Sequence, residues 1–239
     1  MEHRVLGVIG ASGGLGASTL AVALAVRAAR SVGATVAVDG VFERGGLDVT
    51  ACLEHVTGLR WTDLRDAQGE VDGADLLRSL PVDGVARVLA ARGDTPPDEV
   101  VATCLKALSS ICALTLVDLG GSLRWADECT DLVLVCGVTA RHLADASALA
   151  AGLSHHPTPA RLVVRAGRRE AVTAEEVAEH LDLPHAVTLR DDPQVAADAD
   201  RARPPGTRKG GAFVGGVDRL LAELDIHRLG DVDAERRSA

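Results

Sequence analysis

The sequence is poor in aromatic side chains and in lysine, and its acidic residues outnumber its basic ones. Its 239 residues include two lysines and four aromatic rings, with no tyrosine, and the net charge is −9. Phosphate neutralisation needs clustered lysine and arginine, and single-strand binding needs aromatic platforms for the bases. These shortages argue against a general nucleic-acid-binding protein, so we expect no specific nucleic acid partner.

Long apolar runs and paired cysteines are also missing. No run approaches the roughly 18 residues of a membrane span, and the N-terminus lacks a signal-peptide layout. We therefore expect a cytoplasmic protein with no direct membrane insertion. An odd number of cysteines without C-x-x-C spacing favours buried reduced thiols over a disulfide frame or a zinc site. The cysteines are Cys52, Cys104, Cys112, Cys129 and Cys136.

Apolar runs alternate with helical patterns along the chain. The runs predict strands at 4–9, 35–39, 85–90, 112–118, 131–137, 160–165 and 185–189. Helical patterns fall at about 17–31, 97–110, 140–153 and 173–181, and a loop over 204–216 precedes a short last helix near 217–225. This alternation predicts an α/β fold with a mainly parallel sheet of about seven strands, flanked by helices on both faces. We expect this single domain over 1–226 and a polar, disordered tail over 227–239.

A glycine-rich loop between the first strand and the first helix is the most informative motif. It reads Val8-Ile-Gly-Ala-Ser-Gly-Gly-Leu-Gly-Ala-Ser-Thr19. The glycines allow backbone N–H groups to approach an anion at the helix N-terminus, where the peptide dipoles favour negative charge. A G-x-x-x-x-G-K-[ST] phosphate loop would need glycine at position 11 and lysine at position 17, and both are alanine. The sequence keeps the outline of a phosphate loop and lacks its cation.

Two other chemistries fit the same loop. The segment Gly10–Gly16 matches the G-x-x-x-G-x-G turn of short-chain dehydrogenases, and Asp39 follows where a ribose-binding acid belongs. Those enzymes usually use a tyrosine as proton donor, so its absence argues against hydride transfer and leaves bare dinucleotide binding open. Gly10-Ala-Ser12-Gly-Gly14 also satisfies the G-x-S-x-G nucleophile elbow. It lies on the first strand and the histidines have no suggestive context, so we interpret that match as a coincidence.

Beyond this loop, several segments resemble the MinD/ParA ATPases in order and spacing. Gly13-Gly-Leu-Gly-Ala-Ser-Thr-Leu-Ala21 looks like their G-G-x-G-K-[ST]-T-x-A start. The stretches 36–39 and 45–48 resemble the next strand and switch loop, 114–121 the Walker B strand, and 131–139 the strand after it. Residues 183–195 and 203–204 resemble the MinD ending. The likeness is greatest to the CpaE/TadZ-like and septum-site-determining Ssd-like proteins, whose loops commonly lack lysines. Gly58-Leu-Arg-Trp61 is similar to a stretch of the Ssd-like branch.

This resemblance implies a set of binding residues. Nucleotide contacts are expected from Gly13, Gly14, Leu15, Gly16, Ala17, Ser18, Thr19 and Arg165, the last at a position where the family commonly has an adenine-reading asparagine. Magnesium, where it binds, is expected at Ser18 and, through water, at Asp39 and Asp118. Simpler roles remain open for the same residues. The glycines also suit a tight turn, Ser18 and Thr19 suit helix caps, Asp39 and Asp118 suit loop-capping acids, and Asp48 suits a surface or turn acid.

Departures from the family pattern bear on mechanism. The signature lysine falls at Ser12, the phosphate-loop lysine at Ala17, and the water-orienting acid at Val41. Phosphoryl transfer depends on positioning and charge neutralisation, so these losses together predict no efficient ATPase and no catalytic residues. The alternative is a weak ATPase switch whose cation comes from Arg44, Arg165 or a partner. A dinucleotide-binding, oxidoreductase-like protein is the second alternative.

The resemblance implies a spatial regulator with optional ATP or ADP and magnesium. Such a protein localises a Flp-type pilus or secretion assembly, or the septum site, through contacts with that machinery. We expect a homodimer that is recruited to a pole or membrane by its partners. Relatives of this kind often carry an N-terminal receiver-like domain, and we expect that domain to be absent or removed here because the sequence starts at the first strand.

Overall fold

The computed structural model describes residues 3–43, 45–82, 84, 86–93, 95–167 and 172–226. Within them, seven strands form one sheet in the order β3-β2-β4-β1-β5-β6-β7, and every neighbouring pair is parallel. The strands are β1 (Arg4–Gly10), β2 (Thr35–Asp39), β3 (Arg87–Leu89), β4 (Leu114–Gly120), β5 (Asp131–Gly137), β6 (Ala160–Ala166) and β7 (His185–Arg190). The predicted α/β fold with a parallel sheet is confirmed.

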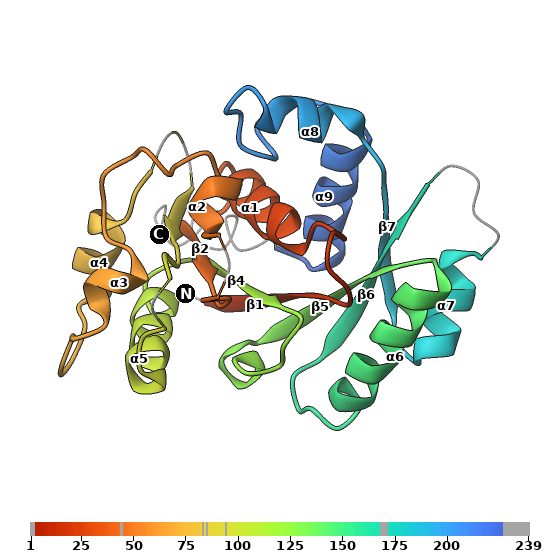
Figure 1. Cartoon of the computed structure of the whole chain (residues 1–239), viewed down its shortest axis with the longest axis horizontal. Helices are drawn as coiled ribbons and strands as arrows, with labels where there is room; N and C mark the ends of the chain where they lie inside the picture. Colours follow the sequence, from red (N-terminus) through yellow and green to blue (C-terminus); the bar gives the residue numbers. More distant parts are fainter. Residues whose placement is uncertain are drawn as a thin grey trace, which may run out of the picture.

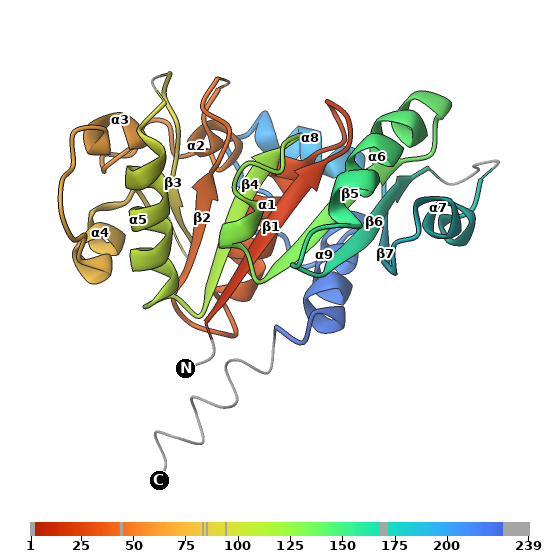
Figure 2. The same ribbon diagram turned by 90° about the horizontal axis from the view of Figure 1, so that it is seen from below.

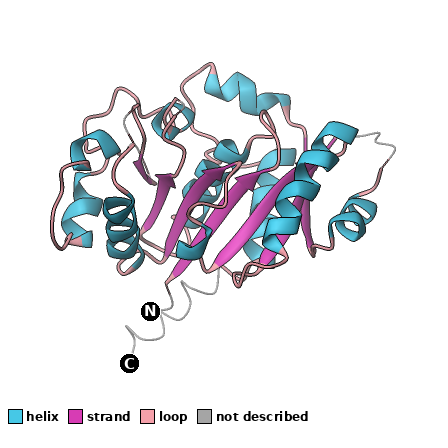
Figure 3. Ribbon diagram, turned by 60° about the horizontal axis from the view of Figure 1, so that its bottom comes forward, coloured by secondary structure: helices cyan, strands magenta, loops and turns pink. Residues whose placement is uncertain are grey.

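Helices cover both faces of this sheet (Figures 1, 2 and 3). One face carries α1 (Ala17–Ala28) and α9 (Ala212–Glu223), and the other carries α5 (Asp98–Ser109), α6 (Ala140–Leu153) and α7 (Ala174–Leu181). Shorter helices lie in the connections: α2 (Leu47–Thr50), α3 (Trp61–Leu64), α4 (Gly73–Ser79), α8 (Pro193–Ala199) and the 3₁₀ turn η1 (Ala126–Glu128). The central strands are therefore buried on both sides, which explains their continuous apolar sequences.

The packing of α1 against the sheet sets the position of the glycine loop. Eight residues of α1 are buried, and all of them are alanine, valine or leucine. Small side chains let the helix lie close to neighbouring backbone, and a Cβ at Gly206 would lie only 2.9 Å from the Ala23 carbonyl oxygen. The N-terminus of α1 is thereby fixed beside the carboxyl end of β1. All five cysteines are buried and free, as predicted. No helix in the described ranges is long and apolar enough to cross a membrane.

Several short helices were not evident in the sequence. The sequence patterns give no indication of α2, α3, α4 or α8, and α9 begins at Ala212, inside the segment predicted as a loop. Tertiary contacts account for α9, because Phe213, Val214 and Val217 are buried in the core despite two neighbouring glycines. Strand β3 is shorter than predicted. The predicted disordered tail over 227–239 lies outside the described residues.

Candidate functional site

The carboxyl ends of the strands open onto a cleft of about 1330 Å³. The glycine loop forms one wall of the cleft, α2 contributes Val49 and Thr50, and α6 contributes Arg141 and Asp145. The ends of β6 and β7 and the start of α8 complete it. All of the predicted nucleotide-binding residues line this cleft: Gly13, Gly14, Leu15, Gly16, Ala17, Ser18, Thr19 and Arg165. The structure therefore brings this predicted set together at the position that open α/β sheets use for ligands.

The loop has the geometry of an anion-binding turn. Gly14 and Gly16 have φ angles of 81° and 79°, in the left-handed region that favours glycine. The N–H groups of residues 13–16 donate to no protein acceptor within the described ranges. Helix α1 begins directly after Gly16, so its free N–H groups and positive dipole end face the same cleft. These donors suit a phosphate or another anion, without a lysine.

Gly13 differs from Gly14 and Gly16, because the conformation and packing of the loop do not require a glycine at its position. Its φ lies outside the left-handed region, and a Cβ at Gly13 would meet no atom of the described residues within 4 Å. At Gly16, in contrast, a Cβ would lie 2.6 Å from Arg165 Nη1. The interpretation of the glycines as turn residues thus accounts for Gly14 and Gly16 and leaves Gly13 without a structural reason. The N-cap of α1 is Gly16, so Ser18 and Thr19 do not cap this helix.

Arg165 brings a cation to the loop from the end of β6. Its Nη1 donates to the Leu15 carbonyl oxygen at 2.9 Å, and its Nε donates to Asp191 at 3.0 Å. The guanidinium therefore lies against the loop from the side of β6. Arg141 and Arg190 also line the cleft. Arg44, the other predicted substitute cation, lies outside the described residues.

Ser12 joins the loop to α6. Its Oγ donates to Asp145 Oδ2 at 2.6 Å, and Arg141 donates to the same oxygen at 3.0 Å. These bonds from Ser12 and Arg141 lower the pKa of Asp145, so its carboxylate is ionised at neutral pH. Ser12 makes no hydrogen bond to a histidine in the described part of the chain, and a nucleophile elbow would need one. Ser12, at the position where the resemblance would place the signature lysine, is thus a neutral residue that hydrogen-bonds to α6.

The two predicted metal-binding aspartates are buried in the sheet and are not among the residues that line the cleft. Asp39 and Asp118 are register partners on β2 and β4, each is 2% exposed, and neither lines the cleft. Asp39 accepts the backbone N–H groups of Val41, Leu47 and Ala91, and Asp118 accepts that of Gly120. Burial raises the pKa of Asp39 to about 6 against the lowering effect of its three hydrogen bonds. Both acids therefore organise loops, as in the simpler interpretation, and their metal role stays a prediction.

The fit to a magnesium nucleotide is therefore uneven. The loop N–H groups, which have no acceptor in the described part of the chain, match phosphate oxygens. Of the predicted metal ligands, Ser18 alone lines the cleft. Val41, at the position expected for the water-orienting acid, packs its methyl group over Gly120, where a Cβ would lie 2.6 Å from Val41 Cγ2. The site suits binding of phosphate better than its transfer.

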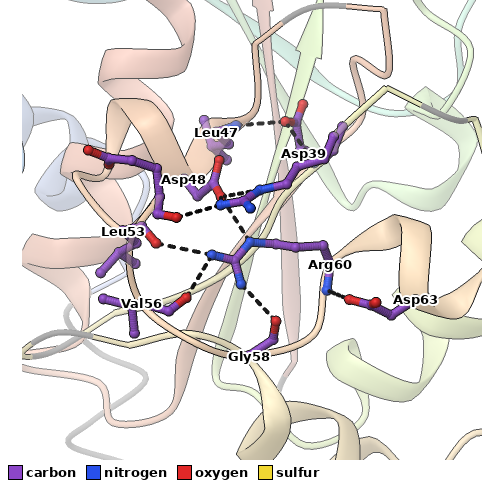
Figure 4. Close-up of polar contacts among 11 residues, drawn as sticks. Asp39, Leu47, Asp48, Leu53, Val56, Gly58, Arg60 and Asp63 are labelled. Atoms are coloured by element: carbon purple, nitrogen blue, oxygen red, sulfur yellow. Dashed lines mark hydrogen bonds and ion pairs between the residues drawn. The ribbon is translucent and has the colours of Figure 1, made fainter.

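A second polar cluster, which sequence reasoning missed, lies beside β2 and β3 (Figure 4). Asp48 is 1% exposed and pairs with the buried Arg60 at 2.8 Å, so its interpretation as a surface or turn acid was wrong. Trp61 Nε1 donates to the Asp39 carbonyl oxygen at 2.8 Å. The sequence carried a signal for this cluster, because the arginine lies between apolar Leu59 and Trp61 in the stretch that resembles the Ssd-like proteins.

No protein-family model matches the sequence. An uncharacterised protein of Mycobacterium tuberculosis, present in strains H37Rv and CDC 1551, is 31% identical over 199 residues, which are 80% of this chain. The aligned region is 56% of that protein, so the chain spans little more than half the length of these relatives.

Solved structures of the ParA and MinD proteins share the fold. A ParA family ATPase from Chlorobium tepidum TLS superposes with a TM-score of 0.81 at 17% identity, over 92% of this chain and 98% of that one. MinD from Pyrococcus horikoshii OT3, complexed with Mg-ADP, superposes with a TM-score of 0.71 at 16% identity, over 93% and 96% of the two chains. The chain has the fold of the ParA/MinD P-loop NTPases, as the resemblance implied.

Proposed function

We propose that this chain is a ParA/MinD-like spatial regulator that binds a nucleotide phosphate at its glycine loop without useful hydrolysis and acts through protein contacts. One observation carries this proposal. The loop has N–H donors without an acceptor among the described residues and open space at Gly13, while its two expected lysine positions are Ser12 and Ala17. A loop of this kind binds anions through the backbone and the helix dipole alone.

The lack of hydrolysis follows from the same residues. Phosphoryl transfer needs cations at the transferred group and an acid or amide that orients the attacking water. Ala17 supplies no charge, Ser12 is engaged with Asp145, and Val41 is packed against Gly120. Each such loss costs about 3–4 kcal/mol of transition-state stabilisation, so the combined loss removes most of the catalysis.

The role in the cell rests on the fold and on the resemblance to the CpaE/TadZ-like and Ssd-like proteins. We propose localisation of a pilus or secretion assembly, or of the septum site, with a homodimer contacting proteins of that machinery. Mg-ADP in the related MinD structure supports ADP or ATP as the ligand. A fluorescent fusion of the full-length native protein should form foci at a pole or septum, and a uniform distribution would contradict this role.

Binding and hydrolysis are tested together on the purified chain. Calorimetry with Mg-ATP should show weak binding, and phosphate release should remain at background. A turnover of about 1 s⁻¹ or more that disappears in Asp118→Ala would refute the proposal. The absence of any ATP, ADP or phosphate binding would refute the nucleotide part of it.

A weak ATPase switch is the second candidate, and the position of Arg165 favours it. The guanidinium contacts the glycine loop through Leu15 and Gly16, so it places positive charge near a bound phosphate. Residual hydrolysis that is lost in Arg165→Gln and kept in Arg161→Gln would support this candidate. Arg161 is on the same strand and pairs with Asp131, away from the cleft.

A further inference from the structure

The buried guanidinium of Arg60 joins several parts of the segment 45–61, which follows β2. Arg60 Nε donates to Asp48 Oδ2 at 2.8 Å, while Nη1 donates to the Gly58 carbonyl and Nη2 to the carbonyls of Leu53 and Val56 (Figure 4). The side chains of Arg60 and Asp48 are 5% and 1% exposed. One arginine thus contacts the beginning, middle and end of the segment. A lysine has no planar fork and could not make this set of contacts.

The same segment is tied to the sheet at both ends. The Leu47 N–H donates to Asp39 at 2.8 Å, and Trp61 Nε1 donates to the Asp39 carbonyl. Gly46 lies so close to the end of β3 that a Cβ there would lie 2.2 Å from the Ala91 carbonyl oxygen. Trp61 is fully buried and stacks edge-on against Phe42, with ring centroids 5.9 Å apart. These contacts leave the segment little freedom to move without breaking the Asp48–Arg60 pair.

Arg92 adds a second, weaker contact to Asp48. It donates to Asp48 Oδ2 at 2.8 Å and to the Glu54 carbonyl, but its side chain is 45% exposed. Burial acts to raise the pKa of Asp48, and the hydrogen bonds from Arg60 and Arg92 outweigh it, so the pKa is lowered. Asp48 is therefore ionised and held between two cations.

Helix α2 links this cluster to the cleft. It begins at Leu47, which is buried, and Asp48 is its second residue. The next two residues, Val49 and Thr50, line the cleft, and Val49 is 58% exposed. A movement of the α2 backbone that carries Asp48 away from Arg60 therefore also moves this wall of the cleft.

We propose that the Asp48–Arg60 pair is a latch that holds the segment 45–61, and with it the α2 wall of the cleft, in one conformation. Arg60 is a positioning residue in this proposal, because it touches the cleft only through α2. A preformed wall costs a ligand no ordering entropy on binding. Because this wall is already ordered, ligand binding would cause no disorder-to-order transition in it.

The latch predicts a local effect when it is broken. Removing one partner of a buried pair leaves an uncompensated charge, whereas removing both leaves none. Hydrogen exchange of the buried, hydrogen-bonded amides of Leu47, Ala51 and Leu53 should be as slow in the unmodified chain as in the core strands. In Arg60→Gln and in Asp48→Asn we expect it to be about a hundredfold faster, with β1 and β5 unchanged. The double variant should exchange no faster than the faster single variant, because the two changes remove one interaction.

Graded variants and a matched control make the test specific. Arg60→Lys keeps the charge and should give an intermediate acceleration, and Arg92→Gln should give a smaller one because Arg92 is half-exposed. Arg78→Gln breaks the exposed Arg78–Asp75 pair on α4 and should leave residues 45–56 unchanged. Three outcomes would overturn the latch. They are fast exchange of the Leu47, Ala51 and Leu53 amides in the unmodified chain, equal acceleration in β1 and β5, and no acceleration in any latch variant.

Discussion

Replacing Gly13 by alanine separates the folding role of the glycine loop from a binding role. The φ of Gly13 is not left-handed, and no atom of the ranges that the structure describes lies within 4 Å of a Cβ built there, so the folded state should accept the methyl group without strain. The unfolded chain loses conformational freedom when glycine becomes alanine. We therefore expect Gly13→Ala to leave the free energy of unfolding unchanged or to raise it by about 0.4–1 kcal/mol.

The other two glycines serve as matched comparisons. Gly14→Ala places a Cβ at a φ of 81°, which should destabilise the fold by about 1–2 kcal/mol. Gly16→Ala combines a φ of 79° with a contact of 2.6 Å to Arg165 Nη1, so it should cost more than Gly14→Ala. Urea unfolding of the three variants gives this order directly.

Ligand binding should follow a different order. If phosphate approaches the N–H groups of residues 13–16, the methyl group of Gly13→Ala obstructs it, and affinity for Mg-ATP or inorganic triphosphate should fall about tenfold or more. That loss corresponds to about 1.4 kcal/mol, in a protein of unchanged stability. Unchanged affinity would show that no phosphate approaches Gly13. A loss of stability above about 1 kcal/mol would show that the loop imposes a constraint absent from these contacts.

Three further results are expected. Ala17→Lys should tighten Mg-ATP binding in calorimetry, because it adds a cation beside the loop N–H groups, and no gain in a folded variant would mean that the loop does not bind phosphate. The pKa of Asp39 is raised from 3.8 to about 6, so as the pH falls this carboxyl is protonated in the folded chain before it is protonated in the unfolded chain. The free energy of unfolding relative to that of Asp39→Asn should therefore rise, by at most about 3 kcal/mol, as the pH falls from 7 to 4. Equal pH dependence of the two urea midpoints would refute burial as the dominant influence on Asp39. With Ser12 at the signature position, light scattering over a concentration series should show the same homodimer with and without Mg-ATP, and a monomer that dimerises only with ATP would contradict this.

The sequence by itself determined the sheet and the place of the cleft. The apolar runs that became β1, β4 and β5 can be buried on both faces, and only a parallel sheet between two helical layers does this for so many runs. The glycine loop marked the carboxyl end of β1, because its residues favour a sharp turn into a helix. Such information is local, since it depends on residues a few positions apart.

Only the tertiary structure decided which charged groups meet. Asp48 looks like a surface acid in the sequence, yet it is buried and paired with two arginines. Arg60 lies twelve residues further along the chain, and Arg92 follows β3. Arg165 reaches the Leu15 carbonyl across 150 residues, and Ser12 reaches Asp145 across 133. No periodicity encodes these distances, because the strand order of the sheet sets them. Whether an acid lies in water or between two arginines is therefore settled by the packing of segments far apart in the chain.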